Sequence, residues 1–176
     1  MATTKTAQEL ASKPALERLA DLRTIEDELA RRTMTAQVYD ILLREWKQDR
    51  RYRGGAEHLV DEIHLWYRQG FESLAKQARS RRKVDLPSFR RLNGNLHHHH
   101  SYEDRAWFPV LKRLHPECRP ELKILEKDHR KLVELEAKVE DGDFEAMVEF
   151  CDHLVDHLNR EEMLSVPWLL EGTGGL

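Results

Sequence analysis

The stretch "HHSYEDRAWFP" (residues 99–109) sets a histidine, His99, four residues before a glutamate, Glu103. The same spacing returns in "HLNREEMLSVP" (residues 157–167), where His157 precedes Glu161. Residues four apart lie on one face of an α-helix with their Cβ atoms about 6 Å apart, so both side chains of a pair can reach one site. The fold follows from where these two pairs fall in the apolar pattern around them.

Four helices are predicted around these pairs, because apolar residues recur every three or four positions. We expect them over about residues 56–79, 88–110 with Ser88 as the cap, 120–139, and 147–164 after a turn at "DGD" (residues 141–143). Their short connections indicate antiparallel neighbours. The sequence therefore predicts an all-α fold, an up-down-up-down four-helix bundle.

The apolar stripe of each predicted helix contains a polar residue that is unusual for a core. All four stripes carry a histidine, and two also carry a glutamate: His64, His99 with Glu103, His129, and His157 with Glu161. The second stripe is expected to continue through Ala106 and Val110. A buried carboxylate without a partner costs several kcal/mol, so two cations are expected to neutralise this layer. Imidazole and carboxylate ligands without thiolate favour iron or manganese, with zinc possible.

The first 55 residues carry no motif that assigns them a role. Their spacing predicts a two-helix extension, one helix from Pro14 to about Arg31 and a second, capped by Thr33 or Thr35, that ends before Gly54. We expect this extension to pack on the bundle or to mediate assembly, with a second copy or another protein. The expected organisation is an extension over residues 1–55, a bundle over 56–168 and a tail over 169–176.

Composition excludes several other classes of protein. The net charge of −3 gives no general attraction to nucleic acid. No run of about 18 apolar residues is present, so no membrane span is expected. The N-terminus lacks the apolar core of a signal peptide, which favours a cytoplasmic location. The two cysteines are too few for a disulfide framework and are expected to be free thiols.

Both stretches follow the pattern H-x-x-x-E-[DE]-x-x-x-x-P, and this doubled motif resembles the hemerythrin-like, or HHE cation-binding, domains. "EKDHRKL" (residues 126–132) is similar to that family's third-helix histidine segment, and the resemblance covers about residues 56–168. It implies a non-haem di-iron centre with a bridging oxo or hydroxo group. Four histidines would be terminal ligands and two glutamates would bridge the irons: His64, His99, His129, His157, Glu103 and Glu161.

One position departs from the oxygen-carrying members of that family. They have a further histidine four residues after the third-helix histidine, where this chain has Val133. Iron-sensing relatives instead use a neighbour of the second-helix histidine, which here is His100. At about 100° per residue, His100 lies about 70° from the middle of its stripe and can reach the site from the flank. His97 and His98 lie about 130° away and are expected to face solvent or a neighbouring helix.

Three other polar residues near the motifs receive weaker assignments. His153 flanks the fourth stripe and is expected to bind metal less readily than to support a ligand. Asp104 and Glu162 follow the two motif glutamates, and we expect them to face water or to support ligand histidines. A ferritin-like centre would need two Glu-x-x-His elements, and the chain has one, Glu126 with His129.

The ligand count bears on function. Two irons of about six positions each, sharing two carboxylates and one bridge, leave six positions, and five histidines leave one open. The predicted function is therefore reversible binding of O2 or a related diatomic molecule by a sensor, store or carrier. Two alternatives stay open: a di-iron enzyme acting on peroxide or NO, and an iron-responsive interaction module. No residue is assigned a catalytic role, and a bundle with satisfied core histidines and no metal is the simplest competing interpretation.

Overall fold

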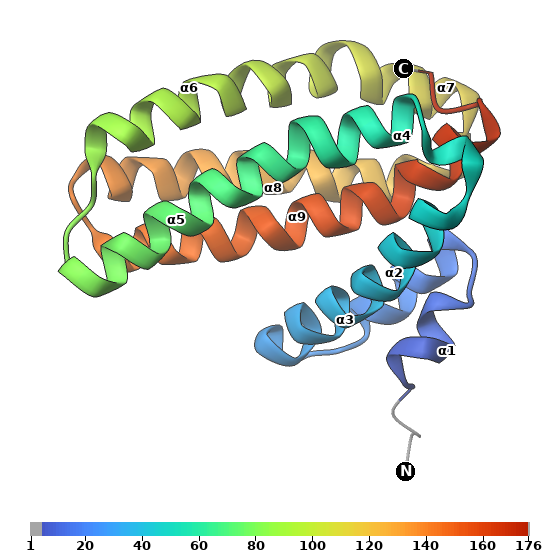
Figure 1. The fold of residues 1–176 in the computed structure, drawn as a ribbon, viewed down its shortest axis with the longest axis horizontal. Coiled ribbons are helices and arrows are strands. Elements are labelled where there is room, and N and C mark those ends of the chain that lie inside the picture. Colours follow the sequence, from blue (N-terminus) through green and yellow to red (C-terminus); the bar gives the residue numbers. More distant parts are fainter. Residues whose placement is uncertain (1–4, 176) are drawn as a thin grey trace.

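Four long helical segments form a bundle in the computed structural model, which describes residues 5–175 (Figure 1). No strand occurs within those residues, which confirms the all-α prediction. The segments are α5 (Leu65–Arg81), preceded by α4 (Gly55–Glu57) and η2 (His58–His64); α6 (Leu86–Tyr102), continued by η3 (Glu103–Trp107) and α7 (Phe108–Leu114); α8 (Arg119–Glu140), preceded by η4 (Pro116–Cys118); and α9 (Phe144–Glu171).

Short turns join consecutive bundle helices, so neighbours run antiparallel (Figure 1). The turn before α9 is at the expected "DGD": Gly142 has a positive φ of 87°, and the Asp143 carboxylate accepts hydrogen bonds from the first amides of α9. The predicted cap of α6 was wrong by three positions. Asp85 caps it, accepting from the Ser88 amide at 3.3 Å, with Pro87 in the first turn.

The N-terminal extension differs from the predicted two helices. It contains α1 (Ala7–Ala11), α2 (Ala15–Arg23), α3 (Glu28–Gln48) and the short turn η1 (Arg50–Tyr52). The expected helix to Arg31 was wrong because Asp27 caps a new helix by accepting from the Ala30 amide at 2.7 Å. Leu29 continued the apolar spacing in the sequence, yet it is 75% exposed. Thr35, proposed as a cap, lies buried inside α3.

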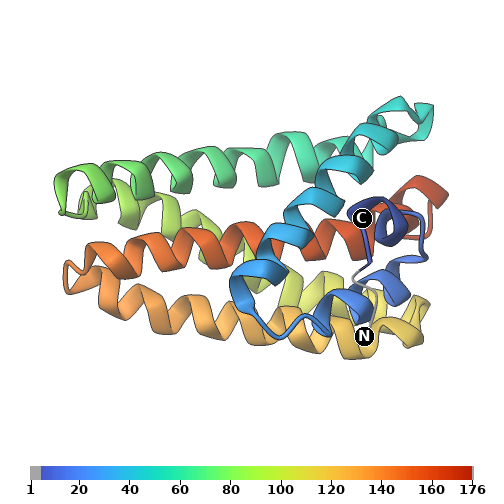
Figure 2. The ribbon, with the colours of Figure 1, turned by 90° about the horizontal axis from the view of Figure 1, so that it is seen from below.

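Helix α3 attaches the extension to the bundle. Figure 2 shows it crossing α9 obliquely, and its buried face consists of Thr35, Val38, Tyr39, Leu42 and Trp46. Each of these residues has another of the set three or four positions away, so they form one face of the helix. The extension is thereby held against the same helix that carries one of the two His–Glu motifs.

The bundle core is divided into two apolar clusters. One, which we call the distal cluster, surrounds Phe71, Phe89 and Phe150. The other surrounds Phe108 and Leu122 and includes the buried residues of the N-terminal helices. Along each bundle helix, the predicted ligand residues fall between the two clusters. They form a polar layer across the bundle, which we call the ligand layer.

The second predicted stripe was wrong beyond Glu103. The helix widens there into the π-helical turn η3, whose hydrogen bonds span five residues rather than four, and the buried face shifts by about one position. Trp107 and Leu111 are therefore buried in place of the expected Ala106 and Val110. The predicted stripe assumed α-helical spacing along the whole segment, so it did not include this shift.

Among residues 5–175, no helix has the length and apolar character needed to cross a membrane.

Candidate metal centre

Each bundle segment supplies at least one side chain to the ligand layer. His64 ends η2, His129 comes from α8, and the others come from α6 with η3 and from α9: His99, His100, Glu103, His157 and Glu161. Six of the seven residues are buried, and the His99 side chain is 11% exposed. All seven predicted ligands thus lie in one water-poor layer, where an unpaired charge is costly.

Two groups of ligand atoms are present in the described chain, and within each group the atoms lie within 4.8 Å of one another. The first, here the His64 group, contains His64, His99, Glu103 and Glu161. The second, here the His100 group, contains His100, Glu103, His129 and His157. Glu103 belongs to both, so the two groups adjoin. The structure brings every predicted ligand into one or both of them, while metal binding by each residue stays a prediction.

The histidine nitrogens face one another at distances that suit a shared metal. His64 Nε2 lies 3.0 Å from His99 Nε2, and His129 Nε2 lies 3.2 Å from His157 Nε2. Two nitrogens bound at about 2.1 Å and at right angles on one metal would be about 3.0 Å apart. In each pair at most one nitrogen can donate a hydrogen bond, and in the metal-loaded state both would point lone pairs at the ion.

The two carboxylates connect the groups. Glu103 Oε1 lies 2.9 Å from His99 Nε2, and Glu103 Oε2 lies 3.3 Å from His129 Nε2. Glu161 does the same at longer range, 3.7 Å from His64 Nε2 and 3.5 Å from His157 Nε2. All four oxygens are buried without a properly directed hydrogen bond from the described residues, and so is His100 Nε2. Buried polar atoms in such numbers call for a missing partner, and the donor set fits a pair of cations.

Two π-helical turns lie at the ligand layer. The turn η2 ends at His64, and the turn η3 begins at Glu103. Such turns widen an α-helix locally and are frequent at functional sites. His99 and His100 are adjacent on α6 and point about 100° apart around the helix, so they belong to different groups, while Glu103 belongs to both.

Carboxylates orient three of the histidines from behind. The Nδ1 atom of His64 lies 2.8 Å from Glu162, that of His129 lies 3.0 Å from Asp104, and that of His157 lies 3.5 Å from Asp128. A proton held on Nδ1 by a carboxylate leaves the Nε2 lone pair free for a metal. Asp104 and Glu162 therefore occupy the supporting positions considered from the sequence, and the Asp104 side chain is also 40% exposed.

The pKa values of the residues in the layer are shifted in different directions. Burial lowers the pKa of His157 to about 3. Burial also acts to lower the pKa of His129, but the neighbouring carboxylates of Asp104 and Glu103 raise it to about 9. Burial and the nearby charges of Glu103 and Glu162 raise the pKa of Glu161 well above its usual range. Without metal, the layer therefore favours a charged His129 at neutral pH, and its burial and charges favour the protonated form of Glu161.

The pKa of Glu103 is shifted in the opposite direction to that of Glu161. Burial acts to raise its pKa, yet the surrounding imidazoles, above all His99 and His129, hold that pKa well below its usual range. The carboxylate next to the most basic histidine is thus the one that stays charged. This pairing places a permanent anion between the two groups.

The remaining histidines of the run lie outside both groups. His97 and His98 are exposed, and His97 contacts Glu136 at 2.8 Å. His153 also lies outside them, with its Nε2 3.5 Å from Asp128. The four-histidine run therefore divides into two surface residues and two residues of the ligand layer.

Sequence reasoning missed four residues that surround the layer. Asp128 precedes His129 on α8 but faces His157 on α9, and Arg160 holds it at 2.9 Å. Tyr39 and Arg68 both contact Glu162, at 2.5 and 3.0 Å. The motif itself suggested a supporting role for the acid after each glutamate, but the partners of those acids come from other helices and needed the tertiary structure.

A pocket of about 190 Å³ leads from the surface to the His100 group. It opens between α6 and α8 and is lined in part by His100, His129, Asp104 and Val133. Val133, the residue at the position of the absent histidine, is 52% exposed and stands at this opening. A small molecule thus has a route to the side of the layer where His100 lies.

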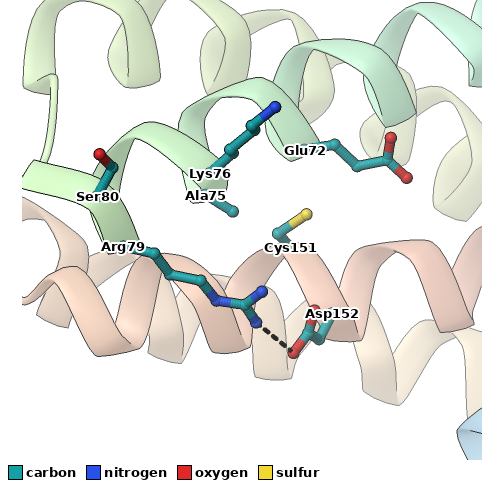
Figure 3. Close-up of a pocket in the computed structure, with 7 residues that line it drawn as sticks. All are labelled: Glu72, Ala75, Lys76, Arg79, Ser80, Cys151 and Asp152. Carbon is teal, nitrogen blue, oxygen red and sulfur yellow. Dashed lines mark ion pairs between the residues drawn. The ribbon is translucent and has the colours of Figure 1, made fainter.

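A larger pocket, of about 550 Å³, lies elsewhere between α5 and α9 (Figure 3). Its lining includes Glu72, Lys76 and the ion pair of Arg79 with Asp152 at 3.8 Å, and it includes none of the seven predicted ligands. Burial raises the pKa of its Cys151 to about 12, so the thiol is not a nucleophile near neutral pH. This pocket is a surface feature separate from the ligand layer.

Comparison with protein families gives one match. The hemerythrin HHE cation binding domain matches residues 55–169, which covers the whole ligand layer and all but the last two residues of the bundle segments. No curated protein and no solved structure matches the chain significantly. Because the match spans well over half of the chain, and because buried His and Glu clusters suited to a metal occupy the layer, the chain belongs to the hemerythrin HHE cation-binding domain family.

Proposed function

We propose that this chain binds two iron ions in the ligand layer and reversibly binds O2 or a related small molecule there, as a sensor, store or carrier. The observation that supports this most is the arrangement of Glu103 and Glu161. Each carboxylate has one oxygen near a histidine of the His64 group and the other near a histidine of the His100 group. Carboxylates in that position suit bridges between two ions.

The protein's own residues would hold and tune such a centre. The histidine Nε2 atoms point inward, since the Nδ1 atoms of His64, His129 and His157 face carboxylates. Manganese or zinc would also fit this donor set, and iron is preferred because its redox chemistry, when bound, would support reversible binding of a diatomic molecule. Apart from the pocket beside His100, the layer is buried, which limits the access of water to it.

Access to the layer is consistent with a small ligand. The pocket beside His100 is about 190 Å³, and its inner wall includes the rings of His100 and His129, which stack with centroids 3.9 Å apart. A molecule of two or three atoms can approach along this route. His100 takes part in the layer from the same side, so we propose it as the fifth histidine ligand in place of the histidine absent at Val133.

The test is reversible oxygen binding by protein loaded anaerobically with ferrous iron. We expect an absorption band that appears in air, disappears under argon and returns over several cycles. Glu103→Ala should abolish the band, because Glu103 contributes to both groups. A band that decays irreversibly on first exposure would contradict a carrier or store. Catalytic release of oxygen from added peroxide, lost in Glu103→Ala, would favour the enzyme instead.

A further inference from the structure

The N-terminal segment, residues 5–53, reaches the surroundings of the ligand layer through α3. On the buried face of that helix, Tyr39 is 7% exposed and points its hydroxyl at α9. The hydroxyl donates to Glu162 Oε2 at 2.5 Å. Glu162 is fully buried and directly follows the predicted ligand Glu161. A side chain from outside the bundle therefore completes the hydrogen bonding of a carboxylate inside it.

The other oxygen of Glu162 contacts the layer itself. Glu162 Oε1 lies 2.8 Å from His64 Nδ1 and accepts from Arg68 Nη1 at 3.0 Å. The Arg68 guanidinium also stacks over the Tyr39 ring, 4.9 Å from its centroid. Tyr39 and Arg68 together fix the carboxylate that orients His64. The hydrogen-bond series runs from Tyr39 through Glu162 to the imidazole whose Nε2 faces the His64 group.

We propose that Tyr39 is a positioning residue for the metal site, and that through it the N-terminal segment responds to whether the site is loaded. This inference rests on metal binding in the ligand layer, but not on the identity of the small molecule bound there. Bound metal requires the Nε2 lone pair of His64, so the Nδ1–H must donate to Glu162, which is the arrangement that Tyr39 supports. Metal and docked α3 thus favour the same hydrogen-bond pattern.

A pocket beside the same face of α3 supports the same inference. Thr35, one turn before Tyr39, lines a pocket of about 380 Å³ together with Asp128, His153 and Arg160. Asp128 is the carboxylate behind His157. One face of α3 therefore meets the supporting carboxylate of the His64 group directly and borders that of the His100 group.

Metal binding and the docking of α3 must affect each other equally, and both effects can be measured. If the docked α3 strengthens metal binding by some factor, bound metal must strengthen the docking of α3 by the same factor. Two readouts follow that require no activity: the affinity for ferrous iron alone, and hydrogen exchange of the α3 amides with and without iron.

The decisive variant is Tyr39→Phe, which keeps the ring under Arg68 and removes one hydroxyl. We expect the affinity for ferrous iron, measured anaerobically in the full chain, to fall about tenfold, the lower end of what loss of an outer partner of a metal-bound histidine causes. Iron should slow hydrogen exchange over Glu28–Gln48 in the unmodified protein and slow it clearly less in the variant.

Tyr52→Phe is the matched control. Tyr52 is also buried, lies in the same N-terminal segment and bonds a carboxylate, Asp61, at 3.1 Å. Asp61 contacts Tyr52 and Lys47 and, unlike Glu162, no histidine of the ligand layer. The control should lose a similar hydrogen bond while keeping the iron affinity and the iron-dependent protection of α3.

The outcomes separate the two proposals. Unchanged iron affinity and unchanged α3 protection in Tyr39→Phe would overturn the inference while leaving the metal site intact. Absence of iron binding by the unmodified protein would overturn both. Should Tyr39→Phe fail to fold, the unmodified protein still decides, because α3 exchange that does not respond to iron contradicts the inference.

Discussion

The ligand layer and the distal cluster are built from the same four helices with the same spacing, yet they are stabilised differently. In the distal cluster the rings of Phe71, Phe89 and Phe150 contact one another with centroids 5.1 to 6.2 Å apart. In the ligand layer, buried Glu103 and Glu161 oxygens have no well-directed hydrogen bond from residues 5–175. One region is complete as a polypeptide, and the other has a donor set that fits a cation as its missing partner.

The largest effect on stability is expected in the distal cluster. Phe150→Ala should lower the free energy of unfolding by about 3–5 kcal/mol, because it leaves a cavity among aromatic rings. Denaturant unfolding of metal-free protein measures this. Folded Phe150→Ala protein should keep its full metal content, since Phe150 contributes no atom to either ligand group. Loss of metal together with stability would show that the two regions are not separate.

The converse change is Glu161→Gln in the ligand layer. Burial raises the pKa of Glu161 and so favours its neutral form in the metal-free protein. An amide of the same size should therefore change the unfolding free energy by no more than about 1 kcal/mol. Metal content should nevertheless fall, since the amide is a poor substitute for a bridging carboxylate. Metal analysis and denaturant unfolding on the same sample test both halves, and an unaltered metal content would contradict the assignment of Glu161.

The division between the two regions was largely predictable from sequence. The apolar stripes and the repeated His–Glu spacing predicted the bundle and six residues of the layer, and the family resemblance added His100. What was not predictable came from breaks in regularity: the π-helical turn at Glu103, the new helix start at Asp27, and the supporting residues Tyr39 and Asp128. The last two act across helices far apart in sequence, so no local pattern records them.

A smaller effect is expected from pH. Metal must displace the proton of His129, whose pKa is about 9, and that of Glu161, whose pKa is raised by burial. Below these pKa values the protons compete with metal, so affinity should rise with pH, by about tenfold per pH unit for each proton displaced. Competition with a chelator between about pH 6 and pH 8 measures the slope. A flat profile would show that neither group is protonated in the metal-free layer.

The smallest effect is expected from the surface half of the histidine run. His97→Ala combined with His98→Ala should change the unfolding free energy by about 0.5 kcal/mol or less, since both side chains are exposed. The stoichiometry of tightly bound iron should be unchanged. His100→Ala is the contrasting variant, because His100 is buried in the layer, and it should weaken metal binding.

The most direct test of the ligand layer is a count of tightly bound iron per chain. The protein should be expressed without a purification tag, supplemented with iron and washed with a mild chelator. The His97→Ala, His98→Ala double variant should be treated in parallel, so that iron held by the exposed histidines is subtracted. Two irons per chain in both proteins is the predicted result. Fewer than one transition metal per chain would contradict the di-iron centre.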